Sequence, residues 1–359
     1  MWRRSPKKSK TANIKIFKIS AVCILQTAVI LLFHFFKPFR IYSFVSKMKG
    51  EIKMKEYYPE GFLIGTRQNS FYLQSAANLY SAAAEGVVLE APAVLCDRSH
   101  DLTVDLGCMK GIIKREEGAI GIAEGTTRDI AVISRVGKPV CFKILSIETD
   151  TSGNLFANLS RRAAQTECRD YIIRNTSCGD ITDAKITHLE SFGAFCDIGC
   201  GNVALMPIDS ISVSRISHPT DRFSVGDNIK AVIKNIASDG RITLTHKELL
   251  GTWEENAREF SQGQTVTGVV RSVEDYGIFV ELTPNLAGLA ETGPDVKAGD
   301  GVCVYIKSIL PEKMKIKLII IDKLDFALRG QIKYYFTGKH IERFDYSPEN
   351  APKQISVEF

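Results

Sequence analysis

The sequence predicts a mainly β protein built from three tandem small barrels, because one strand pattern occurs twice and a second string occurs three times. The strand pattern runs over residues 182–198 and again over 266–282. The second string, a glycine turn followed by a strand with β-branched residues near every second position, occurs at 136–147, 225–236 and 298–309. Internal repeats fix an architecture, and about five short strands in about 70 residues describe a small closed barrel.

The repeats divide the chain into consecutive segments. A basic and apolar extension, a divergent first barrel, two further barrels and a tail are predicted at residues 1–53, 54–165, 176–250, 262–328 and 329–359. Polar, helix-forming sequence follows the exit strands of the first two units, so 161–174 and 248–260 are predicted to be short linker helices. We expect Trp253 to pin the second helix to a barrel.

Each copy of the strand pattern carries two aromatic residues around a glycine. The pairs are Phe192 with Phe195 and Tyr276 with Phe279. Residues three apart on a plain strand point to opposite faces, so a bend at the glycine or a bulge beside it is needed if both rings are to meet one ligand. A single aromatic on an alternating strand is more often a core residue. The recurrence of the pair and its glycine nevertheless favours at least one base-stacking residue per unit.

The chain resembles a known family at these positions. The F-G-A-F and Y-G-I-F strands, the G-D strand starts and the L-S-R-R and L-T-H-K exits (159–162 and 244–247) are similar to the S1 RNA-binding domain. The resemblance covers about residues 85–328, and the P-E-K-M-K-I-K-L stretch (311–318) looks like the shortened ribosomal S1-related proteins of Gram-positive anaerobes. It implies OB-fold barrels on which single-stranded RNA lies, with its bases stacked on the aromatic pair.

The resemblance also implies an RNA-binding face in the second and third units. Its residues are Phe192, Phe195, His246, Lys247, Tyr276, Phe279, Lys315 and Lys317. The chain departs from the family at Pro207 and Glu291, which stand where the family often has a histidine. The first unit has no aromatic in D-L-T-V-D-L-G (101–107), so we expect it to bind RNA poorly and to serve docking.

Charge is distributed unevenly along the chain. Residues 1–53 hold 12 basic residues and one acidic residue, whereas the remainder holds 34 basic and 40 acidic residues, a net charge of −6. An acidic body does not attract RNA phosphates globally, so binding is expected to come from stacking and from local basic residues. We expect Arg215 and Arg222 to be solvated in a long loop at 207–224, with phosphate contact as the alternative. His188 and His218 are expected to be surface or satisfied polar histidines.

No catalytic, metal or cofactor motif accompanies these features. The nine cysteines include no C-x-x-C pair, which argues against a zinc site and fits a reducing compartment. The motifs of nucleotide hydrolases, serine hydrolases and zinc peptidases are absent from the sequence. We therefore expect a cytoplasmic, non-enzymatic protein without a cofactor that holds single-stranded mRNA at the small ribosomal subunit during translation. Two alternatives stay open: an RNA-decay accessory protein and a membrane-tethered RNA-binding or interaction module.

The membrane alternative depends on the apolar run at residues 19–36, which has about the shortest length that spans a bilayer. Basic residues flank the run almost equally, so the positive-inside rule gives no orientation. Met48 and Met54 lie directly before the point where a soluble composition begins. This change in composition favours the interpretation that translation starts at Met48 or Met54 and that residues 1–47 are upstream sequence read in frame, rather than a membrane anchor.

A protein that begins at Met48 or Met54 is therefore expected to be soluble, monomeric and as thermally stable as a longer form, because the barrels need nothing from the apolar run. Gel filtration and thermal unfolding of both forms measure this. Recovery of a native peptide that begins within residues 1–20 from carbonate-washed membranes would contradict the expectation, since a span of about 18 apolar residues is not released by pH or salt.

Overall fold

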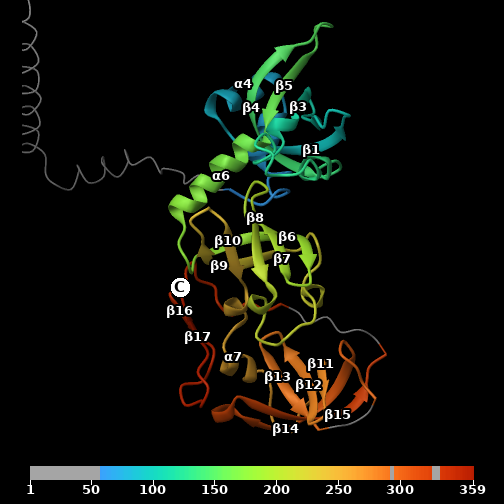
Figure 1. Cartoon of the computed structure of the whole chain (residues 1–359), viewed down its shortest axis with the longest axis vertical. Helices are drawn as coiled ribbons and strands as arrows, with labels where there is room; N and C mark the ends of the chain where they lie inside the picture. Colours follow the sequence, from blue (N-terminus) through green and yellow to red (C-terminus); the bar gives the residue numbers. More distant parts are fainter. Residues whose placement is uncertain (1–56, 292–294, 326–331) are drawn as a thin grey trace, which may run out of the picture. The chain divides into compact units, whose positions relative to one another are not determined.

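The computed structural model describes residues 57–291, 295–325 and 332–359, and three closed barrels of five strands follow one another within them (Figure 1). The predicted fold class, mainly β with three tandem barrels, is confirmed. The apolar run at 19–36 and both alternative start sites lie outside the described residues. Within the described ranges, no helix has the length and apolar character needed to cross a membrane.

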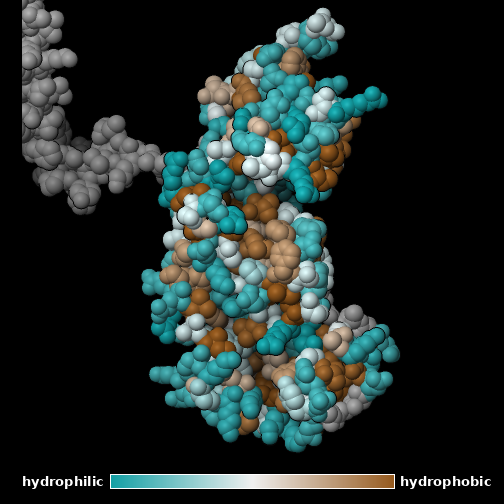
Figure 2. Space-filling view, viewed as in Figure 1, coloured by the Kyte–Doolittle hydropathy of each residue, from teal (hydrophilic) through white to brown (hydrophobic). Residues whose placement is uncertain are grey.

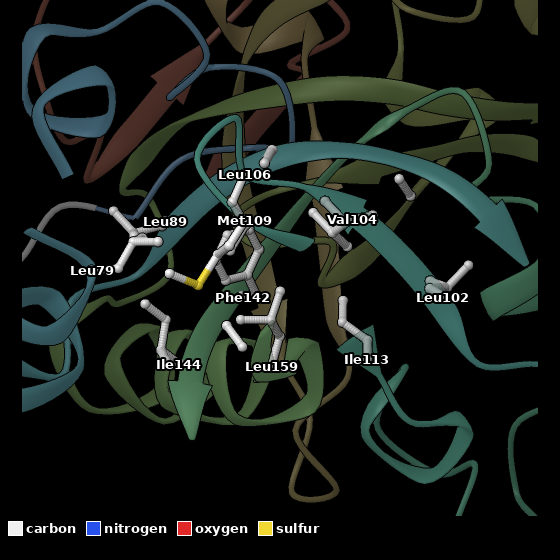
Figure 3. Packing of buried hydrophobic residues seen from close by; sticks show 14 of the residues in the cluster. Leu79, Leu89, Leu102, Val104, Leu106, Met109, Ile113, Phe142, Ile144 and Leu159 are labelled. Carbon is white, nitrogen blue, oxygen red and sulfur yellow. The ribbon is translucent and has the colours of Figure 1, made fainter. Parts of the chain in front are cut away.

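Barrel 1 is preceded by two helices, α3 (Arg67–Leu73) and α4 (Ala76–Glu85). Its strands are β1 (Leu89–Cys96), β2 (Leu102–Asp105), β3 (Lys110–Ile113), β4 (Pro139–Thr149) and β5 (Leu155–Ser160), and η1 (Arg115–Glu117) and α5 (Ile130–Ile133) lie between β3 and β4. The strands close in the order β1-β2-β3-β5-β4, and only the β3–β5 pair is parallel. Figure 3 shows the core, in which Leu79 of α4 lies with Leu89, Phe142 and Leu159 of the barrel.

Barrels 2 and 3 repeat this topology. Barrel 2 comprises β6 (Ile181–Glu190), β7 (Gly193–Asp197), β8 (Val203–Pro207), β9 (Asn228–Ile236) and β10 (Ile242–Thr245), with η2 (Ile208–Ser210) and η3 (Pro219–Asp221) between β8 and β9. Barrel 3 comprises β11 (Thr265–Glu274), β12 (Gly277–Thr283), β13 (Leu286–Ala290), β14 (Gly301–Leu310) and β15 (Lys315–Lys323), with η5 (Pro311–Lys313) before β15. In both barrels the third and fifth strands pair in parallel, as they do in barrel 1.

Short helices join the barrels, as predicted. They are α6 (Arg161–Asn175), η4 (Lys247–Leu250) and α7 (Trp253–Ala257). The Ser160 hydroxyl caps α6 by accepting the N–H of Ala163, and Thr252 and Glu255 form a reciprocal capping box on α7. Trp253 is 3% exposed and packs in the core of barrel 3, so its predicted anchoring role is confirmed.

Barrels 1 and 2 meet at a buried charged cluster, the first junction. Arg161 at the start of α6 donates from Nε to Oε1 of Glu60 at 2.6 Å, and Arg135 Nη1 lies 3.1 Å from Oε2 of Glu60. Burial favours the neutral acid, but these two guanidinium groups hold the pKa of Glu60 below its ordinary value. Asp197 of β7 accepts the Glu60 backbone N–H at 2.7 Å, and burial together with the Glu60 charge raises the pKa of Asp197 to about 7.

Barrels 2 and 3 meet at a second buried cluster, the second junction. Arg222, from the loop between β8 and β9, forms an ion pair with Glu281 of β12, and each of the two residues is 3% exposed. Arg271 of β11 donates from Nε to Glu281 at 2.7 Å. The prediction that Arg222 is solvated is therefore wrong, because a buried carboxylate from the next barrel requires a cation beside it.

The tail at 332–359 packs on both later barrels. It contains a two-stranded sheet of β16 (Arg343–Asp345) and β17 (Ser356–Glu358). The Ile341 N–H donates to the carbonyl of Gly179 at the entry to barrel 2, at 2.9 Å. The Tyr346 hydroxyl donates to the carbonyl of Asn285 in barrel 3, at 2.6 Å. The tail thus ties barrel 2 to barrel 3.

Glu281→Gln is expected to destabilise the protein by about 3–5 kcal/mol, because Arg222 and Arg271 then remain buried beside a neutral amide. Urea unfolding followed by tryptophan fluorescence measures the loss through Trp253. The matched control is Glu274→Gln, which removes an exposed acid at the end of the neighbouring strand. Equal unfolding midpoints for the two variants would show that the buried ion pairs do not hold the second junction.

Candidate nucleic-acid interface

Strand register places one residue of each strand in a row across the outer face of a barrel, which we call the central row. In barrel 2, Phe195 of β7 pairs with His188 of β6 and with Leu205 of β8. The complete rows are His188, Phe195, Leu205, Thr243 and Asn235 in barrel 2, and Ser272, Phe279, Leu289, Lys317 and Ser308 in barrel 3. Phe195 and Phe279 therefore occupy equivalent positions at the centre of an outer face.

The two aromatic pairs lie together in space. The ring centroids of Phe192 and Phe195 are 5.9 Å apart with the planes at 89°, and those of Tyr276 and Phe279 are 6.1 Å apart at 86°. Phe192 is 55% exposed and Tyr276 is 70% exposed. Both residues sit in the turn before the strand rather than on it, so the alternation that would send them to opposite faces does not apply. The pairing predicted from sequence is present, without the bend within the strand that it was expected to need.

Glycine is required between the two aromatics because the next strand approaches closely. A Cβ atom on Gly193 would lie 2.4 Å from the carbonyl oxygen of Met206, and one on Gly277 would lie 2.6 Å from that of Ala290. Real Cβ atoms do not come so near to backbone oxygen, so any larger residue would push β8 or β13 away. The recurrent glycine thus keeps the third strand packed beside the stacking residues.

His188 belongs to this face, although the sequence analysis placed it only on the surface. Its ring lies 6.2 Å from that of Phe195 with the planes at 28°, and its Nε2 is 2.6 Å from a carboxylate oxygen of Glu190. A register shift between Ile186 and His188 turns the side chain onto the outer surface. Sequence shows the histidine but not the bulge, which depends on the pairing of β6 with β7.

The predicted lysines of barrel 3 are well placed. Lys317 is part of the central row, directly beside Leu289, and Lys315 lies two residues earlier on the same strand. Both are exposed, and neither has an ion-pair partner within the described ranges. Glu291, by contrast, pairs with Lys307 at 3.3 Å. Two unpaired lysines of this barrel therefore lie on the outer face that carries Phe279.

The structure places the predicted basic residues of barrel 2 away from the central row. His246 is 1% exposed, and its Nδ1–H donates to the Ile211 carbonyl at 3.2 Å while Nε2 accepts the Tyr334 hydroxyl at 3.3 Å. Burial lowers the pKa of His246 to about 4, so the ring is neutral and structural. Lys247 is partly buried, and its ammonium donates to the Asp209 carbonyl at 3.3 Å.

Barrel 1 has the same row with different chemistry. Its residues are Leu95, Thr103, Ile112, Asn158 and Ser146, none of them aromatic. The Asn158 amide donates to Ser146 at 2.9 Å and to Glu148 at 2.7 Å. A row with neither a stacking ring nor a cation, whose Asn158 amide is engaged by Ser146 and Glu148, is poorly suited to RNA, in agreement with the expectation drawn from the sequence.

Hydropathy alone does not distinguish the candidate interface from the rest of the surface. Figure 2 shows a face on which apolar residues are scattered among polar ones rather than gathered in a single patch. Among the exposed large apolar side chains, Phe192 and Tyr276 are distinguished by their partners, Phe195 and Phe279, and by their repeated geometry. Isolated exposed apolar residues are normal on proteins, so the repetition carries the assignment.

Comparison with known proteins agrees with this geometry. Residues 177–247 match the family model of the S1 RNA binding domain. The small ribosomal subunit protein bS1 of Leuconostoc lactis is 28% identical over 250 residues, which cover 66% of this chain and 56% of that protein. The protein of the same name from Staphylococcus aureus (strain COL) is 32% identical over 179 residues, 45% of this chain and 46% of that protein. The predicted resemblance to the S1 RNA-binding domain and to ribosomal protein S1 is confirmed.

The chain spans about half the length of the curated relatives it matches. Among solved structures, a multidomain protein with nucleic acid binding domains from Streptococcus pneumoniae is 14% identical, with a TM-score of 0.22 over 66% of this chain and 74% of that one.

The buried His246 makes stability depend on pH. Its pKa is about 4 in the folded protein against an ordinary value of 6.5, so its contribution to the free energy of unfolding is full above pH 6.5 and is lost as the pH falls to about 4. The loss amounts to at most about 3 kcal/mol. His246→Gln, which cannot titrate, is expected to lose less stability between pH 7 and pH 4.5, measured as the shift in urea midpoint. Parallel pH profiles for parent and variant would refute this assignment.

Proposed function

We propose that this chain binds single-stranded RNA on the outer faces of barrels 2 and 3, and that it holds mRNA at the small ribosomal subunit during translation, in the cytoplasm and without catalysing a reaction. The observation that carries the proposal is the repeated pair of an exposed and a partly buried aromatic ring at the same register position of two successive barrels. Phe192 with Phe195 and Tyr276 with Phe279 form these pairs.

Stacking supplies most of the affinity in this proposal. An exposed aromatic ring offers a platform for any base, and each stacked base contributes about 1–3 kcal/mol. Phe192 and Tyr276 are more than half exposed, so their rings are available to a base without rearrangement. Phosphate attraction is local, because the body of the chain is acidic and Lys315 and Lys317 lie on the same outer face as Phe279.

The place of action is proposed from the relatives. Two proteins that share 28% and 32% identity with this chain are named small ribosomal subunit protein bS1. Sedimentation of cell extracts through a sucrose gradient tests the assignment. Comigration of the protein with 30S particles supports a role in translation, whereas comigration with an RNA-degrading enzyme and absence from ribosomal fractions would contradict it.

Phe195→Ala and Phe279→Ala are each expected to weaken the binding of a single-stranded RNA oligonucleotide by roughly five- to a hundredfold, because each removes one stacking contact. Fluorescence anisotropy at fixed salt measures the change, and thermal unfolding checks that the fold is kept. The double variant is expected to bind more weakly than either single variant.

Phe71→Ala is the matched control for both variants. Phe71 is 56% exposed on α3, beside barrel 1, and lies on neither central row. Its removal changes the number of exposed aromatic rings without touching the proposed face. Unchanged affinity in both barrel variants, with melting temperatures equal to that of the parent, would place the binding surface elsewhere. Melting far below the parent would show that these rings support the core instead.

A further inference from the structure

A cleft lies beside the first junction, where α6 faces one end of barrel 2. It encloses about 400 Å³, which is within the range of small-molecule sites. One part of its lining is apolar and comes from both barrels, namely Ile120, Ile198, Val203 and Ile242. The other part is cationic, with four arginines: Arg135, Arg161, Arg169 and Arg241. An apolar wall beside guanidinium groups suits a flat ring that carries an anionic group.

The acidic residues of the cleft are already engaged. Glu60 pairs with Arg161 and Arg135, and Asp239 accepts from Arg241 Nε at 2.7 Å. Asp197 accepts the backbone N–H groups of Glu60, Gly199 and Gly201.

Within the described ranges, two arginines of the cleft keep donor groups that make no hydrogen bond. Arg169 of α6 is partly buried and has no ion-pair or hydrogen-bond partner within the described ranges. The Nε of Arg135 is buried and makes no hydrogen bond in the described part of the chain. Buried donors without partners are uncommon in native proteins. Both observations point to an anionic group that the cleft can receive.

The cleft continues the stacking face of barrel 2. Val203 lies two residues before Leu205 on β8, and Arg241 lies two residues before Thr243 of the central row. Side chains two apart on a strand share a face, so the cleft begins one step along the strands from the row. Thr187, which also lines the cleft, donates its hydroxyl to the Phe195 carbonyl at 3.0 Å. An RNA strand whose base stacks on Phe195 therefore passes directly to the mouth of the cleft.

We propose that this cleft holds one nucleotide of the RNA strand that crosses barrel 2, with a phosphate on Arg169 and the base against Ile198 and Val203. The proposal rests on the RNA-binding function above and extends it to the first junction. It gives barrel 1 a part in binding that its own central row cannot supply, because α6 and Ile120 of barrel 1 form one wall of the cleft.

The test compares Arg169→Ala with Arg174→Ala in the full chain. Both changes remove one positive charge from α6, but Arg174 is 74% exposed, pairs with Asp170 and is not part of the cleft. With a fluorescent oligouridine of about 12 nucleotides, Arg169→Ala is expected to weaken binding about tenfold, the loss of one charge-assisted hydrogen bond. The slope of log affinity against log salt should fall by about 0.7. Arg174→Ala should bind as the parent does.

Equal binding by the parent and both arginine variants, together with weakened binding by Phe195→Ala, would overturn the cleft assignment while the proposed function stands. Equal weakening by both arginine changes would also overturn it, because only the net charge of α6 would then matter. Failure of the parent itself to bind RNA would instead remove the proposed function.

A further titration with free uridine monophosphate separates the two sources of a nucleotide. If the mononucleotide binds in an Arg169-dependent way while oligouridine affinity ignores Arg169, the cleft is a site for a free nucleotide and the assignment to the RNA strand is wrong.

Discussion

A buried acid two residues after the centre of the stacking row governs how successive barrels join. Asp197 follows Phe195 by two positions on β7, and Glu281 follows Phe279 by two positions on β12. Both carboxyl groups are almost fully buried, and a buried carboxyl must be hydrogen-bonded or paired. Asp197 obtains its donors from its own turn and from Glu60, whereas Glu281 obtains its cations from Arg271 and from Arg222 of barrel 2. The acid is a repeated feature, and each barrel satisfies it with its own groups together with one residue from the preceding segment, Glu60 or Arg222.

The same strand therefore serves two purposes at positions two residues apart. Side chains two apart share a face, so the ring and the acid of β7 point to the same side, the ring toward solvent and the acid into the first junction. The hydrogen bonds of the buried acid hold the end of the strand, and the close approach of β8 to Gly193, which leaves no room for a Cβ atom, holds its beginning. A stacking residue held between two constrained ends loses little conformational freedom when a base arrives, which favours binding by a preorganised ring. The equivalent arrangement in barrel 3 follows from Glu281 and from the approach of Ala290 to Gly277.

Sequence predicted the features that depend on local spacing and failed on those that depend on distant partners. The repeats predicted the strands, the barrels and the aromatic pairs, and the polar sequence after the exit strands predicted the linker helices, because each of these features needs only residues close together in the chain. His246 could be aligned with a basic position of the family, but its burial is imposed by Tyr334, 88 residues later in the chain. Arg222 looked like a loop residue because its partner, Glu281, belongs to the next barrel. His188 joins the face through a bulge, and a bulge depends on pairing between two strands rather than on the residue itself.

Barrel 1 shows how one architecture separates folding from binding. Its strand order and parallel closing pair are those of the other two barrels, and its core is complete. The central row differs, because Thr103 stands in place of the ring and Glu148 closes the polar end with hydrogen bonds. The inward positions of the row strands must remain apolar for the barrel to close, whereas the outward positions are free to change. A barrel can thus lose its stacking face without losing its fold, and α6 at its exit can still present Arg161 and Arg169 to the neighbouring barrel.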